Sequence, residues 1–382
     1  MYPLLEGAIG DDTNIESMDT NLSPLIVQYL YVHSRDEAFF YPSSRSSASA
    51  TRVACRYLEC AIAQAASLRL RDADCSLALA TNLEDRRILG RSGVKLLERL
   101  DALGVQMIHA DYRRRPADGS EMFMASRYVL DAILAAVEGQ PGERQLWLTD
   151  LDCVWPNADL MFASAPAKDR IGAIEAPYDP DWLVADAATV GRTRKEIGEL
   201  ASQLGGGVAL EQPPPWIGGE LLSGTPDTLR ALVATCDALD EQLAHVDKVL
   251  PTEEQLLTLA GALGLVRYHD LSGVARRIWT GPRHGAPRID DPLALGLWHL
   301  PAEKGLSLRR AAHEVCSGRV RRLRCDCGDP TRMARRFNVA GNGFLRRVRD
   351  DGWLAGQRVT NAVRSSLRRR RRPHVASGNA DI

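Results

Sequence analysis

Hydrophobic and polar positions follow two periods along the first half of the chain, and these periods predict strands and helices in turn. Residues 26–34 (IVQYLYVHS) are rich in β-branched and aromatic side chains, as is typical of a buried strand. In residues 50–70 apolar side chains recur at helical spacing, which predicts an amphipathic helix. By the same reasoning we expect strands at 75–82, 105–112 and 145–155, and helices at 93–104 and 122–138.

This alternation of strands and helices predicts an α/β fold, with a mostly parallel sheet and helices on both of its faces. In such sheets, ligands bind beyond the carboxyl ends of the strands. The residues at these ends are His33 and Ser34, then Thr81 and Asn82, and above all Asp150. We therefore expect a binding site where these residues meet.

The pattern is weaker in the second half of the chain. Residues 180–215 resemble a helical insertion that ends in glycines and prolines. Residues 221–243 suggest a strand, a turn and a helix that Pro226 opens in its first turn. We expect one catalytic domain over residues 22–308, followed by an arginine-rich C-terminal extension over residues 309–382.

The segment LWLTDLDCVWPNADLMF carries the clearest chemistry. Asp150 ends an apolar run and Asp152 follows two residues later, so in an extended chain both carboxylates point to the same side. Hard divalent ions such as Mn²⁺ or Mg²⁺ prefer carboxylate oxygens and also bind diphosphate oxygens. The spacing therefore predicts a metal site that can stabilise a departing nucleoside diphosphate.

Other enzyme classes fit the sequence less well. Asp150, Asp152 and Val154 also fit the Asp-x-Asp-x-[Thr/Val] motif of haloacid-dehalogenase-type phosphatases, which is an alternative metal-dependent function. Those enzymes place the motif on their first strand, whereas here three strand–helix units precede it, and this order disfavours a phosphatase. The chain also lacks the phosphate loop and the dinucleotide fingerprint, so kinases and dehydrogenases lose their usual support.

Taken in order, residues 50–305 resemble the glycogenin-like retaining glycosyltransferases of the GT-A fold. The Asp150 segment is similar to the metal-binding strand of that family, and Arg127 sits where the family has a donor-binding lysine. WHLPAEKG is similar to its closing motif, in which His299 would bind the metal and Lys304 the diphosphate. The resemblance implies a GT-A-like, Rossmann-like domain. It also implies that this domain binds a nucleotide-sugar donor, a UDP-sugar, together with Mn²⁺ or Mg²⁺.

The family's sugar-binding Asn-Ser-Gly strand corresponds here to WIGGELLSG (216–224), in which Gly218, Gly219 and Glu220 replace that tripeptide. Glu254 and Gln255 resemble an Asp-Gln pair near the reacting centre. Retention is implied, while an inverting reaction with one of these glutamates as general base stays open. The expected site comprises His33, Ser34, Asn82, Arg127, Asp150 and Lys304 for the donor, Asp150, Asp152 and His299 for the metal, Trp216, Gly218, Gly219 and Glu253 for the acceptor or sugar, and Glu220 and Glu254 for catalysis.

Composition bounds the location of the protein. The eight cysteines are scattered, which favours reduced thiols in the cytoplasm. The acidic N-terminus does not resemble a signal peptide, and no apolar run approaches the ~20 residues that span a bilayer. We expect a cytoplasmic protein, at most peripheral to a membrane.

The net charge of −1 conceals two unlike parts: residues 1–308 carry a balance of −14, and residues 309–372 a balance of +14. The basic part could be a solvated charge run, or it could dock on an anionic membrane surface. No nucleic-acid motif is present, so nucleic acid is a disfavoured partner. An anionic-surface binding protein is thus the non-enzyme alternative, and the acceptor of an enzyme could be a glycan, a lipid-linked sugar or a natural product.

Overall fold

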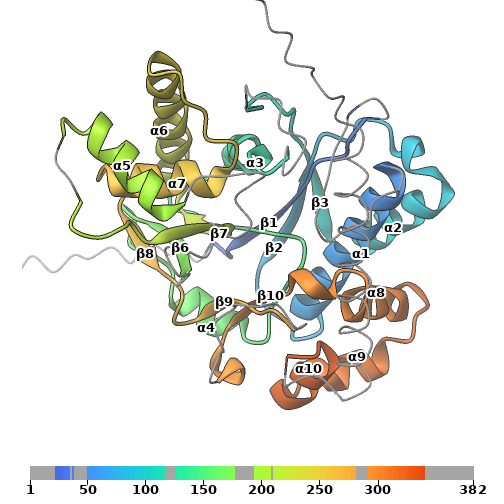
Figure 1. The fold of residues 1–382 in the computed structure, drawn as a ribbon. Coiled ribbons are helices and arrows are strands. Elements are labelled where there is room, and N and C mark those ends of the chain that lie inside the picture. Colours follow the sequence, from blue (N-terminus) through green and yellow to red (C-terminus); the bar gives the residue numbers. More distant parts are fainter. Residues whose placement is uncertain are drawn as a thin grey trace, which may run out of the picture.

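A computed structural model describes the chain in six main segments. They comprise residues 22–34 with residue 37, and residues 50–116, 125–176, 193–207, 210–280 and 291–339. Within them, seven strands form one sheet in the order β3-β2-β1-β4-β7-β6-β8 (Figure 1). These strands are β1 (Leu25–Leu30), β2 (Ser76–Thr81), β3 (Val105–His109), β4 (Leu146–Thr149), β6 (Ile171–Ala176), β7 (Trp216–Gly224) and β8 (Tyr268–Asp270).

All neighbouring strands of this sheet are parallel except those that pair with β7, which runs antiparallel to both β4 and β6. The mostly parallel α/β sheet predicted from the sequence is therefore confirmed. Because β7 runs the other way, its first residues lie beside the carboxyl end of β4. Thr149, the last residue of β4, pairs with Leu221. This places residues 216–220 of β7 next to the predicted metal site.

Helices cover both faces of the sheet (Figure 1). One hydrophobic core includes side chains of α1 (Ala50–Arg69) and α2 (Gly90–Ala102). The other includes side chains of α3 (Tyr128–Val137), α5 (Arg194–Leu204), α6 (Pro226–His245) and α7 (Glu253–Ala262). Successive residues of a strand alternate between the two cores, as the period of a strand requires: in β1, Ile26 belongs to the first core and Val27 to the second.

Local sequence explains where several helices begin. Pro226 is the first residue of α6, and the Thr225 hydroxyl caps it by accepting a bond from the Thr228 amide. The predicted strand, turn and helix over residues 221–243 are thereby confirmed. α5 begins with a capping box between Thr193 and Glu196. It lies inside the predicted insertion, whose residues 180–192 are outside the described part of the chain.

A second, small sheet brings a late segment of the chain to the end of β4. Its strands are β5 (Cys153–Val154), β10 (Leu297–His299) and β9 (Ala275–Arg277), in the order β5-β10-β9. His299 pairs with Cys153 on one side and with Arg277 on the other. The short elements around these sheets are η1 (Arg86–Leu89), α4 (Ala158–Ala163), η3 (Pro292–Ala294) and η4 (Pro301–Glu303).

Three further helices pack against the first core: α8 (Ser307–Cys316), α9 (Val320–Cys327) and α10 (Pro330–Arg336). α8 crosses the expected domain boundary at residue 308 and lies against α1 (Figure 1). Leu323, Met333 and Phe337 are almost fully buried, so the helices share a core with the sheet. Residues 340–382 of the expected extension lie outside the described residues. Every described helix is too short or too polar to span a membrane.

Candidate metal and donor site

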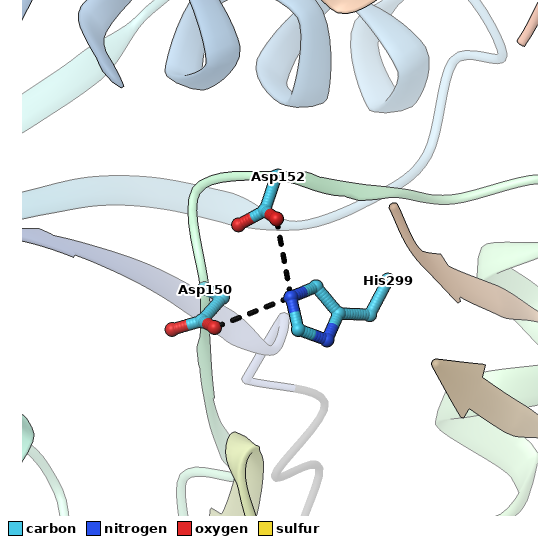
Figure 2. Close-up of side chains that lie close together, drawn as sticks. All are labelled: Asp150, Asp152 and His299. Atoms are coloured by element: carbon cyan, nitrogen blue, oxygen red, sulfur yellow. Dashed lines mark ion pairs between the residues drawn. The ribbon is translucent and has the colours of Figure 1, made fainter. Parts of the chain in front are cut away.

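Two carboxylates and an imidazole meet beyond the carboxyl end of β4 (Figure 2). His299 Nε2 lies 3.3 Å from Asp150 Oδ2 and 3.2 Å from Asp152 Oδ2. In Figure 2 both carboxylates point from the same turn of the chain toward this nitrogen. The potential ligand atoms of the three residues all lie within 4.8 Å of one another. The structure thus brings the three predicted metal ligands together.

Backbone hydrogen bonds fix the turn that carries the two aspartates. The Asp150 amide donates to the Glu220 carbonyl of β7 at 3.0 Å, and the Leu300 amide donates to the Asp152 carbonyl at 2.9 Å. The Tyr29 hydroxyl donates to Asp150 Oδ1 and lies 3.3 Å from the Gly219 carbonyl oxygen. The carboxylates therefore have a defined orientation that depends on β1, β7 and the end of β10.

The donor set fits a divalent cation. The side chains of Asp152 and His299 are only 1% and 5% exposed, and that of Asp150 is 32% exposed. Asp152 Oδ2 and both ring nitrogens of His299 are buried without a well-aligned hydrogen-bond partner. Two carboxylates and an imidazole form a set that suits Mn²⁺ or Mg²⁺ with further oxygen ligands from a substrate. Asp150, the most exposed of the three, leaves one side of the site open to such a substrate.

Acidic side chains outnumber basic ones around this centre in the described part of the chain. The acidic side chains are Asp150, Asp152, Glu220, Glu253 and Glu254, and the basic ones are His299, Lys304 and Arg277. Burial would lower the pKa of His299, but Asp152, followed by Glu220 and Asp150, raises it to about 9. A cation at this place would replace the imidazole proton.

Lys304 lies directly beside the cluster. Its Nζ is 3.2 Å from Asp152 Oδ2, and it sits over the Tyr57 ring at 5.0 Å from the centroid. Burial alone would raise the pKa of Asp152, but Lys304 and His299 outweigh this and hold it well below its usual range. Asp152 therefore stays ionised, and the ammonium group is close enough to meet an anion bound at the same place.

Arg277, which sequence reasoning missed, joins the two predicted catalytic glutamates. Its Nε donates to Glu220 Oε1 at 2.9 Å, its Nη2 donates to Glu220 Oε2 at 2.6 Å, and Nη2 also donates to Glu254 Oε1. Glu254 Oε2 in turn accepts a bond of 2.9 Å from Trp216 Nε1. Trp216 is 4% exposed, so its indole ring is packed in the second core rather than open to solvent.

The two glycines of β7 make room for acidic side chains. A Cβ atom on Gly218 would lie 2.2 Å from Glu220 Oε2, and one on Gly219 would lie 2.4 Å from Glu253 Oε1. Any larger residue would displace these carboxyl groups. Burial, with a contribution from Glu254, raises the pKa of Glu253 to about 8, so its carboxyl group is largely neutral at pH 7.

The predicted donor residues after β1 and β2 are held at the carboxyl end of the sheet. Asn82 Oδ1 accepts from the Val32 amide at 2.7 Å, and its Nδ2 donates to the Val32 carbonyl at 3.0 Å. The Ser34 amide donates to Glu37 Oε2 at 2.8 Å, and His33 Nδ1 lies 3.7 Å from the same oxygen. These contacts fix the loop after β1, while donor binding by His33, Ser34 and Asn82 stays a prediction.

Arg127 is engaged elsewhere. Its side chain is 3% exposed. The guanidinium donates to Asp240 Oδ2 at 2.7 Å, to Asp240 Oδ1 at 3.0 Å and to the Leu250 carbonyl. It therefore ties the start of α3 to α6 and to the segment before α7. Its predicted contact with the donor would compete with these bonds.

Comparisons with known proteins return solved structures only. No family model and no curated protein match the chain. It is similar to the galactosyltransferase LgtC in complex with donor and acceptor sugar analogues, at 13% identity and a TM-score of 0.45 over 77% of this chain and 95% of that one. It is also similar to apo mouse xyloside xylosyltransferase 1, at 12% identity and a TM-score of 0.44 over 73% and 97% of the two chains. Apo WbbM, a bifunctional glycosyltransferase, matches at 9% identity and a TM-score of 0.44 over 77% of this chain and 50% of that one.

Proposed function

We propose that this protein is a metal-dependent glycosyltransferase. It transfers a sugar from a nucleoside-diphosphate-sugar donor, a UDP-sugar, to an acceptor. The observation that carries the proposal is the meeting of Asp150, Asp152 and His299 at the carboxyl end of β4, in a mostly parallel sheet. A divalent cation bound there supplies charge stabilisation for the departing diphosphate. The three side chains would hold Mn²⁺ or Mg²⁺, and Lys304 would meet a diphosphate oxygen.

The contacts of Glu220 disfavour an inverting reaction in which this residue is the general base, and transfer with retention is the reaction that we propose. Its side chain is fully buried and is held by Arg277. Burial would raise the pKa of Glu220, but Arg277 and His299 keep it well below its usual range. A carboxylate held in this way is a weak proton acceptor, which argues against a role as general base. Glu254, whose side chain is 22% exposed, is the glutamate better placed to orient an acceptor.

A donor-hydrolysis assay tests the proposal. The purified chain is incubated with a panel of nucleotide-sugars and Mn²⁺, Mg²⁺ or EDTA, and the released nucleoside diphosphate is measured. We expect one or a few donors to be hydrolysed only with metal, and Asp150→Asn and Asp152→Asn each to lower the rate at least 100-fold. Glu143→Gln, which changes an exposed carboxylate paired with Lys168, serves as the control.

Two outcomes would contradict this function. Full donor hydrolysis by both aspartate variants would remove the metal assignment. Turnover of a simple phosphomonoester without any nucleotide would support the phosphatase alternative instead. If donor hydrolysis is found, a panel of glycans, lipid-linked sugars and natural products then identifies the acceptor class. Vesicles of anionic lipid test whether the chain also docks on a membrane.

A further inference from the structure

The Glu220 carboxylate lies between a guanidinium and the imidazole of the metal site. Oε1 is 2.9 Å from Arg277 Nε and 3.5 Å from His299 Nδ1. On its opposite side, the imidazole presents Nε2 to Asp150 and Asp152. One ring nitrogen thus faces the predicted cation and the other faces Glu220.

The pairing of the small sheet creates this arrangement. His299 of β10 is the register partner of Arg277 of β9, so the two side chains lie next to each other on neighbouring parallel strands. Glu220 approaches from β7, where its own carbonyl accepts the Asp150 amide. The same residue therefore contacts the aspartate turn through its backbone and the histidine through its side chain.

Burial of the Glu220 carboxylate is energetically unfavourable unless the charge is compensated. The Glu220 side chain is fully buried, and an ionised carboxylate in such a place needs partners of opposite charge or hydrogen-bond donors. Arg277 provides two bonds, which fix the plane of the carboxylate. Gly218 leaves the space that the carboxylate occupies. Arg277 and Gly218 thus define where Oε1 points.

We propose that Glu220, fixed by Arg277, is a positioning residue that orients the His299 imidazole for cation binding. This inference rests on the metal site of the proposed function. A histidine that binds a cation through Nε2 carries its proton on Nδ1, and a carboxylate that accepts this proton holds the ring in place. The 3.5 Å separation requires a shift of only a few tenths of an ångström for this bond to form.

Glu254 provides a matched comparison. It also accepts a bond from Arg277, and its other oxygen is bound by Trp216. Its bonded partners do not include His299. Removing the Glu254 carboxylate therefore disturbs Arg277 without removing the partner of the imidazole.

The test measures Mn²⁺ binding by electron paramagnetic resonance, with and without UDP, together with the nitrogen coupling of the bound ion in protein carrying ¹⁴N- or ¹⁵N-labelled histidine. We expect Glu220→Met to weaken Mn²⁺ about 10–100-fold and to lose the imidazole coupling. Glu220→Gln keeps an oxygen that can accept the Nδ1 proton, so it should restore the coupling and most of the affinity. The Mn²⁺ affinity of Glu254→Met should stay within about threefold of the native value, and its imidazole coupling should be retained.

Gly218→Ala gives a second perturbation in case Glu220→Met does not fold, which circular dichroism would reveal. It keeps every charged group but displaces the Glu220 carboxylate. It should weaken Mn²⁺ at least threefold and reduce the imidazole coupling.

Native affinity and native coupling in Glu220→Met, or in Gly218→Ala where Glu220→Met is unfolded, would overturn the inference. The same measurements distinguish failure of the positioning role from failure of the proposed transferase function. If the native chain hydrolyses no nucleotide-sugar yet binds Mn²⁺ through an imidazole that depends on Glu220, the positioning role stands and the transferase does not. If the native chain binds no Mn²⁺ with or without UDP, both are overturned.

Discussion

Arg127→Met separates a structural role of this arginine from the donor-binding role that the sequence predicts. The guanidinium makes two bonds to Asp240 and one to the Leu250 carbonyl, and its side chain is 3% exposed. Breaking a buried ion pair costs about 3–5 kcal/mol. Because the Asp240 side chain is 34% exposed, water can solvate it after the change, and we expect the lower end, about 3 kcal/mol.

A loss of this size should lower Tm by about 4–5 °C in a chain of this length. Thermal and urea unfolding measure the change, and Arg87→Met is the control. The side chain of Arg87 is 89% exposed and pairs with Asp85, so its removal should cost less than about 0.5 kcal/mol. Calorimetric titration with UDP and Mn²⁺ at a temperature where both variants are folded should give Kd values within about threefold of the native value.

The opposite pattern would refute this reasoning. If Tm of Arg127→Met stays within about 2 °C of native while the UDP affinity falls tenfold or more, the arginine contacts the donor as the family's lysine is expected to. A double-mutant cycle with Asp240→Asn adds an independent check. A coupling below about 0.5 kcal/mol would mean that the Arg127–Asp240 pair contributes little to stability.

Three further predictions follow from contacts of other predicted site residues and of the C-terminal helices. Trp216→Phe removes the bond to Glu254 and should cost about 1.5–3 kcal/mol in urea unfolding; unchanged stability with a raised donor KM would instead favour a sugar platform. Burial lowers the pKa of His33 to about 4, so the stability that the neutral imidazole contributes above pH 6.5, up to about 3 kcal/mol, is lost toward pH 4. In urea unfolding, the midpoint should therefore fall toward pH 4, and His33→Gln should reduce this fall. A chain ending at residue 339 should fold and hydrolyse donor, whereas one ending at residue 319 lacks α9 and α10 and should aggregate; a soluble, active shorter chain would contradict this.

The first half of the fold could be predicted because each element there is long and carries a regular pattern of buried side chains. The helix predicted at residues 50–70 is α1, and the strand predicted at 75–82 is β2. The helix predicted at 122–138 is α3, which begins at Tyr128 after a turn over residues 125–127, while residues 122–124 lie outside the described part of the chain. β8, β9 and β10 have three residues each, and so short a segment gives no period to detect.

The candidate site could be predicted only where local spacing or resemblance pointed to it. Asp150 and Asp152 could be predicted because they lie two residues apart at the end of an apolar strand. His299 was predicted from the family resemblance alone. Arg277 had no local sign, because the chain contains 43 arginines and its partner Glu220 lies 57 residues earlier. Tyr29 reads as a strand residue, and its bond to Asp150 depends on the pairing of β1 with β4. Contacts set by strand register are therefore invisible to a local pattern.

The excess of acidic side chains around Asp150, Asp152 and His299 is better explained by cation binding than by a contribution to the stability of the fold. The Arg127–Asp240 pair shows how this fold pairs a buried charge, with one carboxylate bonded to both Nη atoms of the guanidinium. At the centre, acidic groups exceed basic ones, and buried atoms of Asp152 and His299 lack aligned partners. Burying like charges is unfavourable, and apolar residues of similar size would stabilise such a place. Because β10 supplies His299 only when it pairs with β5, the cation site is completed by the late part of the chain and not by the Asp-x-Asp segment alone.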